Sequence, residues 1–223
     1  MGETRWVTFD CFGTLVDWRH GIATGAELLF PGRGAELLKI YSPHERQVQS
    51  ESPRMRYRLV MAEAFRRTAR QAGLDLLEDD VSVLAAGIPY WPAFPDTRGA
   101  LAELRDAGWR LALLTNCDRD IIGETQRRLR VPIDVVVTAE DVGSYKPAHG
   151  HFTHFEATFG ASRDNWVHVA QSYFHDMMPA NALRIPRIWI NRHAAYDPAV
   201  ADAVLPDLAD LRATVEKVHL AAQ

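Results

Sequence analysis

The sequence predicts an α/β protein in which helices cover both faces of a parallel sheet and a helical domain is inserted after the first strand. Short apolar runs alternate with helical patterns over residues 96–223, as they do in βαβ units. Another apolar run stands alone at residues 6–9, and residues 17–95 look helical with no convincing strand. We therefore expect a core formed by residues 1–16 and 96–223, and a cap domain formed by residues 17–95.

The predicted core follows from the order of these runs. Apolar segments rich in β-branched residues are typical of parallel strands that are buried on both faces. The predicted strands occupy residues 6–9, 110–115, 134–138, 166–170 and 187–190. Helical patterns lie between or after them, at residues 97–107, 119–130, 150–159 and 208–220.

Turn-forming residues divide the predicted cap. The sequence PGRG (31–34) separates two helical patterns, and further helices are expected to start at SPHE (42–45) and at SP (52–53). The proline- and aromatic-rich stretch GIPYWPAFPDT (87–97) is typical of a hinge that returns to the core. A cap in this position is expected to close over the C-terminal edge of the sheet, where open α/β sheets bind their ligands.

The composition is that of an ordinary globular protein. Of 223 residues, 47% are hydrophobic and 24% are charged, and the net charge of −4 provides no broad attraction to nucleic acid or to an anionic membrane. The only cysteines, Cys11 and Cys117, imply no disulfide framework and are expected to be small buried residues. No leader pattern or long apolar run is present, so a cytoplasmic location is expected. The assembly state is left open, a homodimer included.

Polar residues follow four of the predicted strands. Because parallel strands share a direction, these residues are expected to meet at one edge of the sheet. Lys146 would then compensate the charge of Asp10 and keep it ionised as a nucleophile. Taken singly, a strand-end Asp is as often a turn or helix-cap residue, and it is the combination that favours a site. The four groups are Asp10 with Thr14, Thr115 with Asn116, Lys146, and residues 172–176.

Four motifs resemble those of the haloacid dehalogenase superfamily, and the match covers nearly the whole chain. They are FDCFGTLVD, LLTN, SYKP and AQSYFHD. The resemblance implies a Rossmann-like core with a helical cap, in which Asp10 is the nucleophile and Thr14 supports it by hydrogen bonding. It also implies that Lys146 neutralises the charged centre and that Asp176 serves the hydrolytic half-reaction.

Phe12 distinguishes branches of that superfamily. Its phosphatases carry a second Asp two residues after the nucleophile, which protonates the leaving group and helps to hold Mg²⁺, and Phe12 cannot do either. Gln171 likewise stands where phosphatases often place an acid. The pattern resembles the metal-independent L-2-haloacid dehalogenase branch, which implies a small 2-haloacid substrate, an aspartyl-ester intermediate, and neither metal nor cofactor. The alternatives are a related hydrolase of another C–X bond, an atypical Mg²⁺-dependent phosphatase, and an idle ligand-binding member.

The resemblance also implies substrate-binding residues. It places Thr115 at the substrate carboxylate and Asn116 at the leaving halide, with Phe12, Ser172 and Tyr173 around the substrate. Well-known members differ by having Ser-Ser-Asn at residues 171–173 and by using a cap arginine to hold the halide. Here Arg54 and Arg58, which share a helix face at i,i+4 spacing, are the candidates, and a solvated basic stripe is the alternative.

Overall fold

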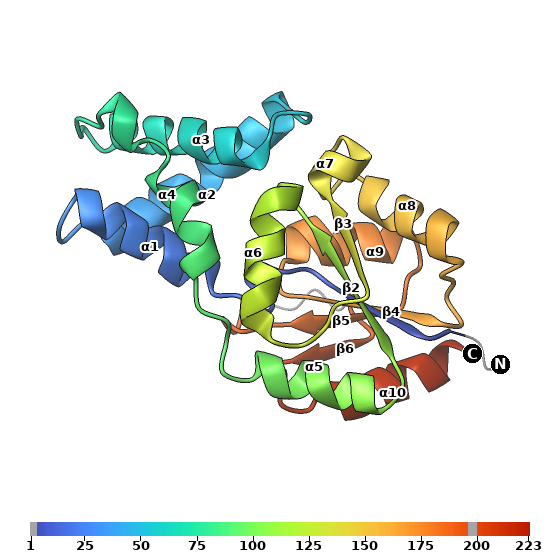
Figure 1. The fold of residues 1–223 in the computed structure, drawn as a ribbon. Helices are drawn as coiled ribbons and strands as arrows, with labels where there is room; N and C mark the ends of the chain where they lie inside the picture. Colours follow the sequence, from blue (N-terminus) through green and yellow to red (C-terminus); the bar gives the residue numbers. More distant parts are fainter. Residues whose placement is uncertain (1–3, 196–199) are drawn as a thin grey trace.

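The computed structural model describes residues 4–195 and 200–223, so residues 1–3 and 196–199 of the predicted core lie outside it. These described residues form one parallel sheet in the order β3-β2-β1-β4-β5-β6, which confirms the predicted fold class (Figure 1). The strands are β1 (Trp6–Phe9), β2 (Arg110–Thr115), β3 (Val135–Thr138), β4 (Trp166–Ala170), β5 (Arg187–Ile190) and β6 (Ala203–Leu205).

The first strand lies in the middle of the sheet because it pairs on both sides. The register places Phe9 beside Leu113 of β2 and beside Val169 of β4. All four residues of β1 are buried, as expected for an apolar strand with neighbours on each edge and helices on each face. As a result, the chain segments that leave β1, β2 and β4 start at nearly the same level of the sheet.

Successive side chains of β1 point to opposite faces of the sheet, so their contacts show which helices cover each face. Val7 and Phe9 pack with helices α5, α6 and α10, whereas Trp6 packs with α8 and α9 on the opposite face. Figure 1 shows α5 and α10 together below the sheet and α8 and α9 above it. The core helices are α5 (Thr97–Asp106), α6 (Arg119–Leu129), α7 (Ala139–Val142), α8 (Gly150–Phe159), α9 (Met178–Ala182) and α10 (Leu211–Ala222).

The inserted segment forms a helical layer to one side of the sheet, at the upper left of Figure 1. Asp17 begins it by capping α1, since its carboxylate accepts a hydrogen bond from the His20 N–H at 3.0 Å. The cap elements are α1 (Trp18–Leu29), α2 (Gly34–Glu51), α3 (Tyr57–Gln71), η1 (Glu78–Asp80), α4 (Val83–Gly87) and η2 (Ile88–Tyr90). The exact division into a cap of residues 17–95 and a core remains a prediction.

One expected helix start in the cap is wrong. No helix begins at residues 42–45, because α2 continues through Pro43 to Glu51. Proline removes one backbone donor and clashes with the preceding turn. Here the burial of Leu37, Tyr41 and Val48 along α2 outweighs that cost. The other expected start, at residues 52–53, falls in the connection after α2, and α3 begins at Tyr57.

The core also differs from the prediction at its C-terminal end. Strand β6 was not predicted, because it is an edge strand of three residues that are only partly buried. The last helix begins at Leu211 and not at Leu208, whose N–H donates to Asp96 Oδ2 at 2.8 Å and is therefore held in a turn. Among the described helices, none is long and apolar enough to cross a membrane.

A buried carboxylate joins the cap to the core. Asp118, which precedes α6 in the core, is 2% exposed and accepts hydrogen bonds from the backbone N–H groups of Tyr57 at 2.8 Å and Arg58 at 3.2 Å. These are the first two residues of α3, whose own sequence provides no side-chain cap. The core therefore supplies the N-cap of a cap helix, and the negative charge also suits that helix end.

We expect Asp118→Ala to lower the free energy of unfolding by about 1–3 kcal/mol, because it removes a helix cap and leaves two N–H groups without partners. Urea unfolding followed by circular dichroism measures this loss. Asp120→Ala is the matched control, since Asp120 also pairs with Arg58 but its side chain is 58% exposed, so it should cost less than about 1 kcal/mol. Equal losses in the two variants would contradict the capping role.

Candidate active site

A buried ammonium group between two carboxylates forms the centre of the site. Lys146 Nζ donates to Asp10 Oδ1 at 3.0 Å, to Asp176 Oδ1 at 2.6 Å and to the Leu114 carbonyl at 2.7 Å. Its three N–H groups are all used in this way, and the residue is 1% exposed. Three of the residues expected to meet at the strand ends therefore do meet there.

The charges of this centre depend on one another. Burial raises the pKa of Asp10 above its ordinary value, and the charge of Asp176 adds to that rise while Lys146 opposes it. For Asp176, burial acts in the same direction, but Lys146 and the hydrogen bond from His168 outweigh it and lower the pKa. The two carboxylates in turn raise the pKa of Lys146 despite its burial. The result is a cation held between a firmly ionised Asp176 and a more basic Asp10.

The turn after β1 fixes the orientation of Asp10. Thr14 Oγ1 donates to Asp10 Oδ2 at 2.9 Å and accepts from the Gln171 N–H at 2.9 Å, so it links the ends of β1 and β4. Gly13 permits the turn, because its φ is +100° and a Cβ there would lie 2.9 Å from the Gln171 side chain. Thr14 therefore lies where the sequence predicted it, beside the carboxylate.

Residues after β2 hold the backbone of Lys146. The Asn116 amide donates to the Lys146 carbonyl at 3.0 Å and accepts from the Lys146 N–H at 2.7 Å. One N–H of that amide is left for a ligand. The Thr115 hydroxyl is buried and makes no hydrogen bond to another described residue, and both side chains border the same cavity as Asp10.

The segment after β4 presents Asp176 through the π-helical turn η3 (Tyr173–Met177). Ser172 caps this turn, since its Oγ accepts from the His175 N–H at 3.1 Å. Behind Asp176, the buried His168 on β4 bridges Asp176 Oδ1 at 3.1 Å and Thr8 Oγ1 at 2.8 Å. Sequence reasoning missed His168, whose only signal is a polar residue inside an apolar strand.

A cavity of about 350 Å³ lies over this centre. Phe12 and Trp18 form part of its wall, and Phe12 is held edge-to-face against Trp91 with ring centroids 5.4 Å apart. The sequence-predicted residues that border it are Asp10, Phe12, Thr115, Asn116, Lys146, Ser172, Tyr173 and Asp176.

The two predicted cap arginines do not border this cavity. Arg58 instead pairs with the core carboxylates Asp118 and Asp120, and Arg54 is exposed in the connection between α2 and α3. The arginines that do border the cavity are Arg19 of α1 and Arg46 of α2. The sequence led us to expect the cavity arginine within or just after that connection, but Asp118 binds the start of α3 and pairs with Arg58. The arginines at the cavity come instead from α1 and α2.

Helix α2 contributes a set of lining residues that the sequence reasoning missed. Ser42, Glu45, Arg46 and Gln49 all border the cavity, as does Tyr57 from α3. Their spacing of i, i+3, i+4 and i+7 was the available signal, since it places the four on one helix face. A polar face of this kind is usually solvated, and only the closure of the cap over the sheet shows that it faces Asp10.

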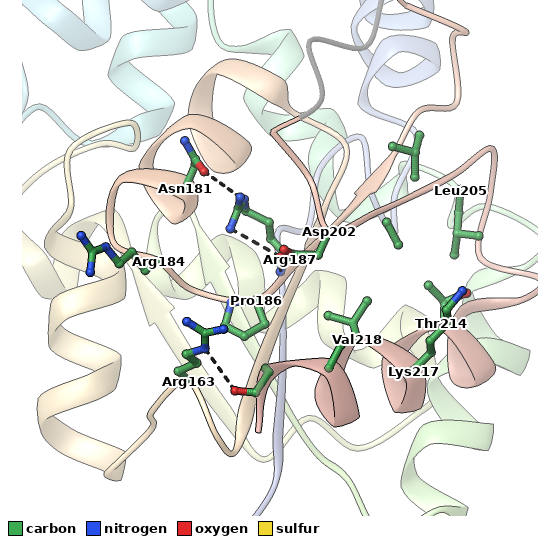
Figure 2. A pocket seen from close by; sticks show the side chains of 14 residues that line it. Arg163, Asn181, Arg184, Pro186, Arg187, Asp202, Leu205, Thr214, Lys217 and Val218 are labelled. Carbon is green, nitrogen blue, oxygen red and sulfur yellow. Dashed lines mark hydrogen bonds and ion pairs between the residues drawn. The ribbon is translucent and has the colours of Figure 1, made fainter.

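A second cavity, of about 490 Å³, lies at the other end of the sheet, next to the start of β5 (Figure 2). Two of its basic residues, Arg163 and Arg187, are paired with neighbours. Arg187 contacts Asn181 and Asp202, and Arg163 donates to the Ala222 carbonyl, as the dashed lines in Figure 2 mark. No predicted site residue borders this cavity, so we place the site at the strand ends around Asp10.

Both cysteines near the centre are free and fully buried. Burial raises the pKa of the Cys11 and Cys117 thiols well above the ordinary value, so both stay protonated at neutral pH. They are packing residues, as the sequence predicted.

Comparison with known proteins gives consistent matches. The family model for haloacid dehalogenase-like hydrolases matches residues 4–182. Haloacetate dehalogenase H-2 of Moraxella sp. (strain B) is 29% identical over an alignment of 208 positions, which covers 88% of this chain and 90% of that protein. The (S)-2-haloacid dehalogenase of Pseudomonas sp. (strain YL) is 28% identical over 232 residues, covering 100% of this chain and 97% of that protein.

Solved structures share the fold. The structure of L-2-haloacid dehalogenase from Xanthobacter autotrophicus with chloropropionic acid covalently bound superposes with a TM-score of 0.83. It is 20% identical in sequence, and the match covers 96% of this chain and 99% of that one. This likeness extends the fold assignment to the sheet and cap together.

Lys146→Met keeps the length of the side chain but removes its charge, so it should lower the free energy of unfolding at pH 7 by about 3–5 kcal/mol. Two buried carboxylates would then lack their counter-charge. Lys39→Met, on the exposed side of α2, is the control and should change stability by less than about 0.5 kcal/mol. Urea unfolding of both variants measures the difference.

The loss in Lys146→Met should depend on pH. Without the cation, the folded-state pKa values of Asp10 and Asp176 lie above the unfolded-state values. Such groups stabilise the fold below the unfolded-state pKa, and that stability is lost as pH rises through the folded-state pKa. The gap between the variant and the wild type should therefore narrow as pH falls from 7 toward about 4. A gap that stays constant would contradict the charge-pairing account.

Proposed function

The chain belongs to the haloacid dehalogenase-like hydrolase family, and we propose that it is a metal-independent hydrolase of small 2-haloacids that works through an aspartyl ester. The observation that carries this proposal is the pairing of a buried nucleophilic carboxylate, Asp10, with an aromatic wall residue, Phe12, two positions later. No proton donor stands at that position, and a halide leaving group needs none. Two relatives that match most of the chain are named dehalogenases of haloacids, which supports the proposal.

The first half-reaction uses Asp10. One of its oxygens forms a bond to the α-carbon of the substrate, and the carbon–halogen bond breaks as halide leaves with the electron pair. Lys146 and Thr14 hold the carboxylate in place, and the apolar wall of Phe12 and Trp18 keeps bulk water away from the displacement. The raised pKa of Asp10 makes it a stronger base, provided that the pH is high enough to ionise it.

The second half-reaction uses Asp176. Its Oδ2 atom is buried and accepts no hydrogen bond from another described residue, while its Oδ1 atom is held by Lys146 and His168. The residue borders the cavity, and its lowered pKa keeps it ionised. Oδ2 is therefore free to accept a proton from the water that attacks the aspartyl carbonyl. The acyl–oxygen bond then breaks, the oxygen of the hydroxy acid takes this proton as it leaves, and Asp10 returns to a carboxylate by releasing its own proton to solvent.

Substrate contacts follow from the same cavity. We assign the substrate carboxylate to the unpaired hydroxyl of Thr115 and the halide to the remaining N–H of Asn116. Arg46 and Arg19 take the role of the cap arginine that we had expected from Arg54 or Arg58. A cytoplasmic location and the absence of a cofactor stay predictions, and the assembly state stays open.

The test is chloride release from (S)-2-chloropropionate, measured by ion chromatography with EDTA present. The wild type should release chloride at a rate that EDTA does not change, and Asp10→Asn should lower kcat by at least about 10³-fold because the nucleophile is gone. Asp17→Asn is the control. Asn caps a helix as well as Asp does, so this variant should keep the wild-type rate.

Two results would contradict the proposal. One is a wild type that releases no chloride, and the other is chloride release that survives in Asp10→Asn. Hydrolysis of phosphate esters that requires Mg²⁺ and stops with EDTA would favour the phosphatase alternative.

A further inference from the structure

The roof of the cavity is polar, although a small haloalkanoate presents only a methyl group or a hydrogen there. Ser42, Glu45, Arg46 and Gln49 lie on one face of α2 and all border the cavity that contains Asp10. The floor, formed at the strand ends, already provides the groups that the displacement needs. Arg46 already has the role of the cap arginine, so Glu45 and Gln49 are the roof groups that another part of the substrate has to explain.

Glu45 is held in a fixed position by two tyrosines. Tyr57 donates to Glu45 Oε1 at 2.7 Å and Tyr41 donates to the same oxygen at 3.3 Å, and both tyrosines are buried. Glu45 Oε2 accepts no hydrogen bond from another described residue. Burial raises the pKa of Glu45 above its ordinary value, although the hydrogen bonds from the two tyrosines oppose the rise. The geometry leaves one oxygen of a rigid carboxyl group for a ligand.

Gln49 provides a second, independent indication. It is 7% exposed, it borders the cavity one helical turn beyond Glu45, and its amide makes no hydrogen bond to another described residue. The Gln49 amide is therefore open to the cavity and available to a ligand there.

The size of the cavity agrees with a longer substrate. Its volume of about 350 Å³ is many times the roughly 10–15 Å³ that one water molecule needs. The 2-chloropropionate ion has only six non-hydrogen atoms, so room remains between its methyl group and α2. Placing that methyl group against Glu45 and Gln49 would leave both polar groups without partners.

The charge around the cavity selects the kind of polar group. Arg19, Arg46 and Lys146 border the same space, and these cations would repel an ammonium substituent. A hydroxyl group carries no charge, donates to a carboxylate and accepts from an amide. It therefore fits between Glu45 and Gln49.

We propose that the preferred substrate is a 2-haloacid with a hydroxyl group on carbon 3, and that Glu45 and Gln49 are the residues that select it. This inference rests on the proposed function. Asp10 forms the bond to carbon 2 as chloride leaves with the electron pair, and water then cleaves the ester at the aspartyl carbonyl. The product is a 2,3-dihydroxy acid, and the hydroxyl on carbon 3 takes no part in bond making.

The experiment compares kcat/KM for chloride release from 2-chloro-3-hydroxypropionate and 2-chloropropionate that share the same spatial arrangement at carbon 2. The wild type should prefer the hydroxylated substrate by about tenfold or more, because a site built to hydrogen-bond a hydroxyl group discriminates against its absence. Glu45→Leu should bring the ratio to about one by losing rate only on the hydroxylated substrate. Glu36→Leu, on the exposed side of α2, is the matched control and should keep the wild-type ratio.

The outcomes separate this inference from the proposed function. Chloride release from both substrates with equal kcat/KM, or a ratio that Glu45→Leu leaves unchanged, overturns the inference and leaves the dehalogenase proposal standing. Chloride release from neither substrate overturns both. If Glu45→Leu fails to fold by circular dichroism, Gln49→Leu decides the question, since the inference requires that its ratio also fall.

Discussion

The site depends on one buried cation. Lys146 has no contact with bulk water, and its charge is balanced by Asp10 and Asp176 from two other strand ends. Removing three charged groups from water is costly, and their mutual attraction offsets that cost only when the geometry is good. The sheet provides this geometry because neighbouring parallel strands end close together: Phe9 of β1 lies beside Val169 of β4, and Thr115 of β2 lies beside Thr138 of β3, the strand that precedes Lys146. The central position of β1 is therefore a requirement of the chemistry as well as of the fold.

Much of this centre was predictable from the sequence, since it depends on local order. Apolar runs mark the strands, and parallel strands bring their ends together whatever the details of the helices. Asp10, Thr14, Lys146 and Asp176 lie where that reasoning placed them, joined in one chain of hydrogen bonds. The buried His168 was not predictable, because the strand pattern does not say which side chains support a neighbouring carboxylate.

The functional residues of the cap were much less predictable, because their role depends on how the cap packs against the core. The basic stripe at Arg54 and Arg58 was the natural candidate for a substrate contact, but Asp118 of the core engages the start of α3 and turns Arg58 away from the cavity. The polar face of α2 has the same spacing as a solvated surface, and only its position over the sheet gives it a function. The helix start predicted at Pro43 was wrong for a similar reason. The packing of α2 against neighbouring helices outweighs the cost of a proline inside the helix.

In this account, the residues at the strand ends carry out the displacement and the residues of α2 select the substrate. The central claim is that Asp10 is transiently esterified. Its most direct test is a single-turnover reaction of excess enzyme with (S)-2-chloropropionate in heavy-oxygen water, followed by mass spectrometry of the peptide that contains Asp10. The account predicts that one heavy oxygen appears in that peptide and none in the hydroxy acid. A heavy oxygen in the hydroxy acid with none in the peptide would contradict it.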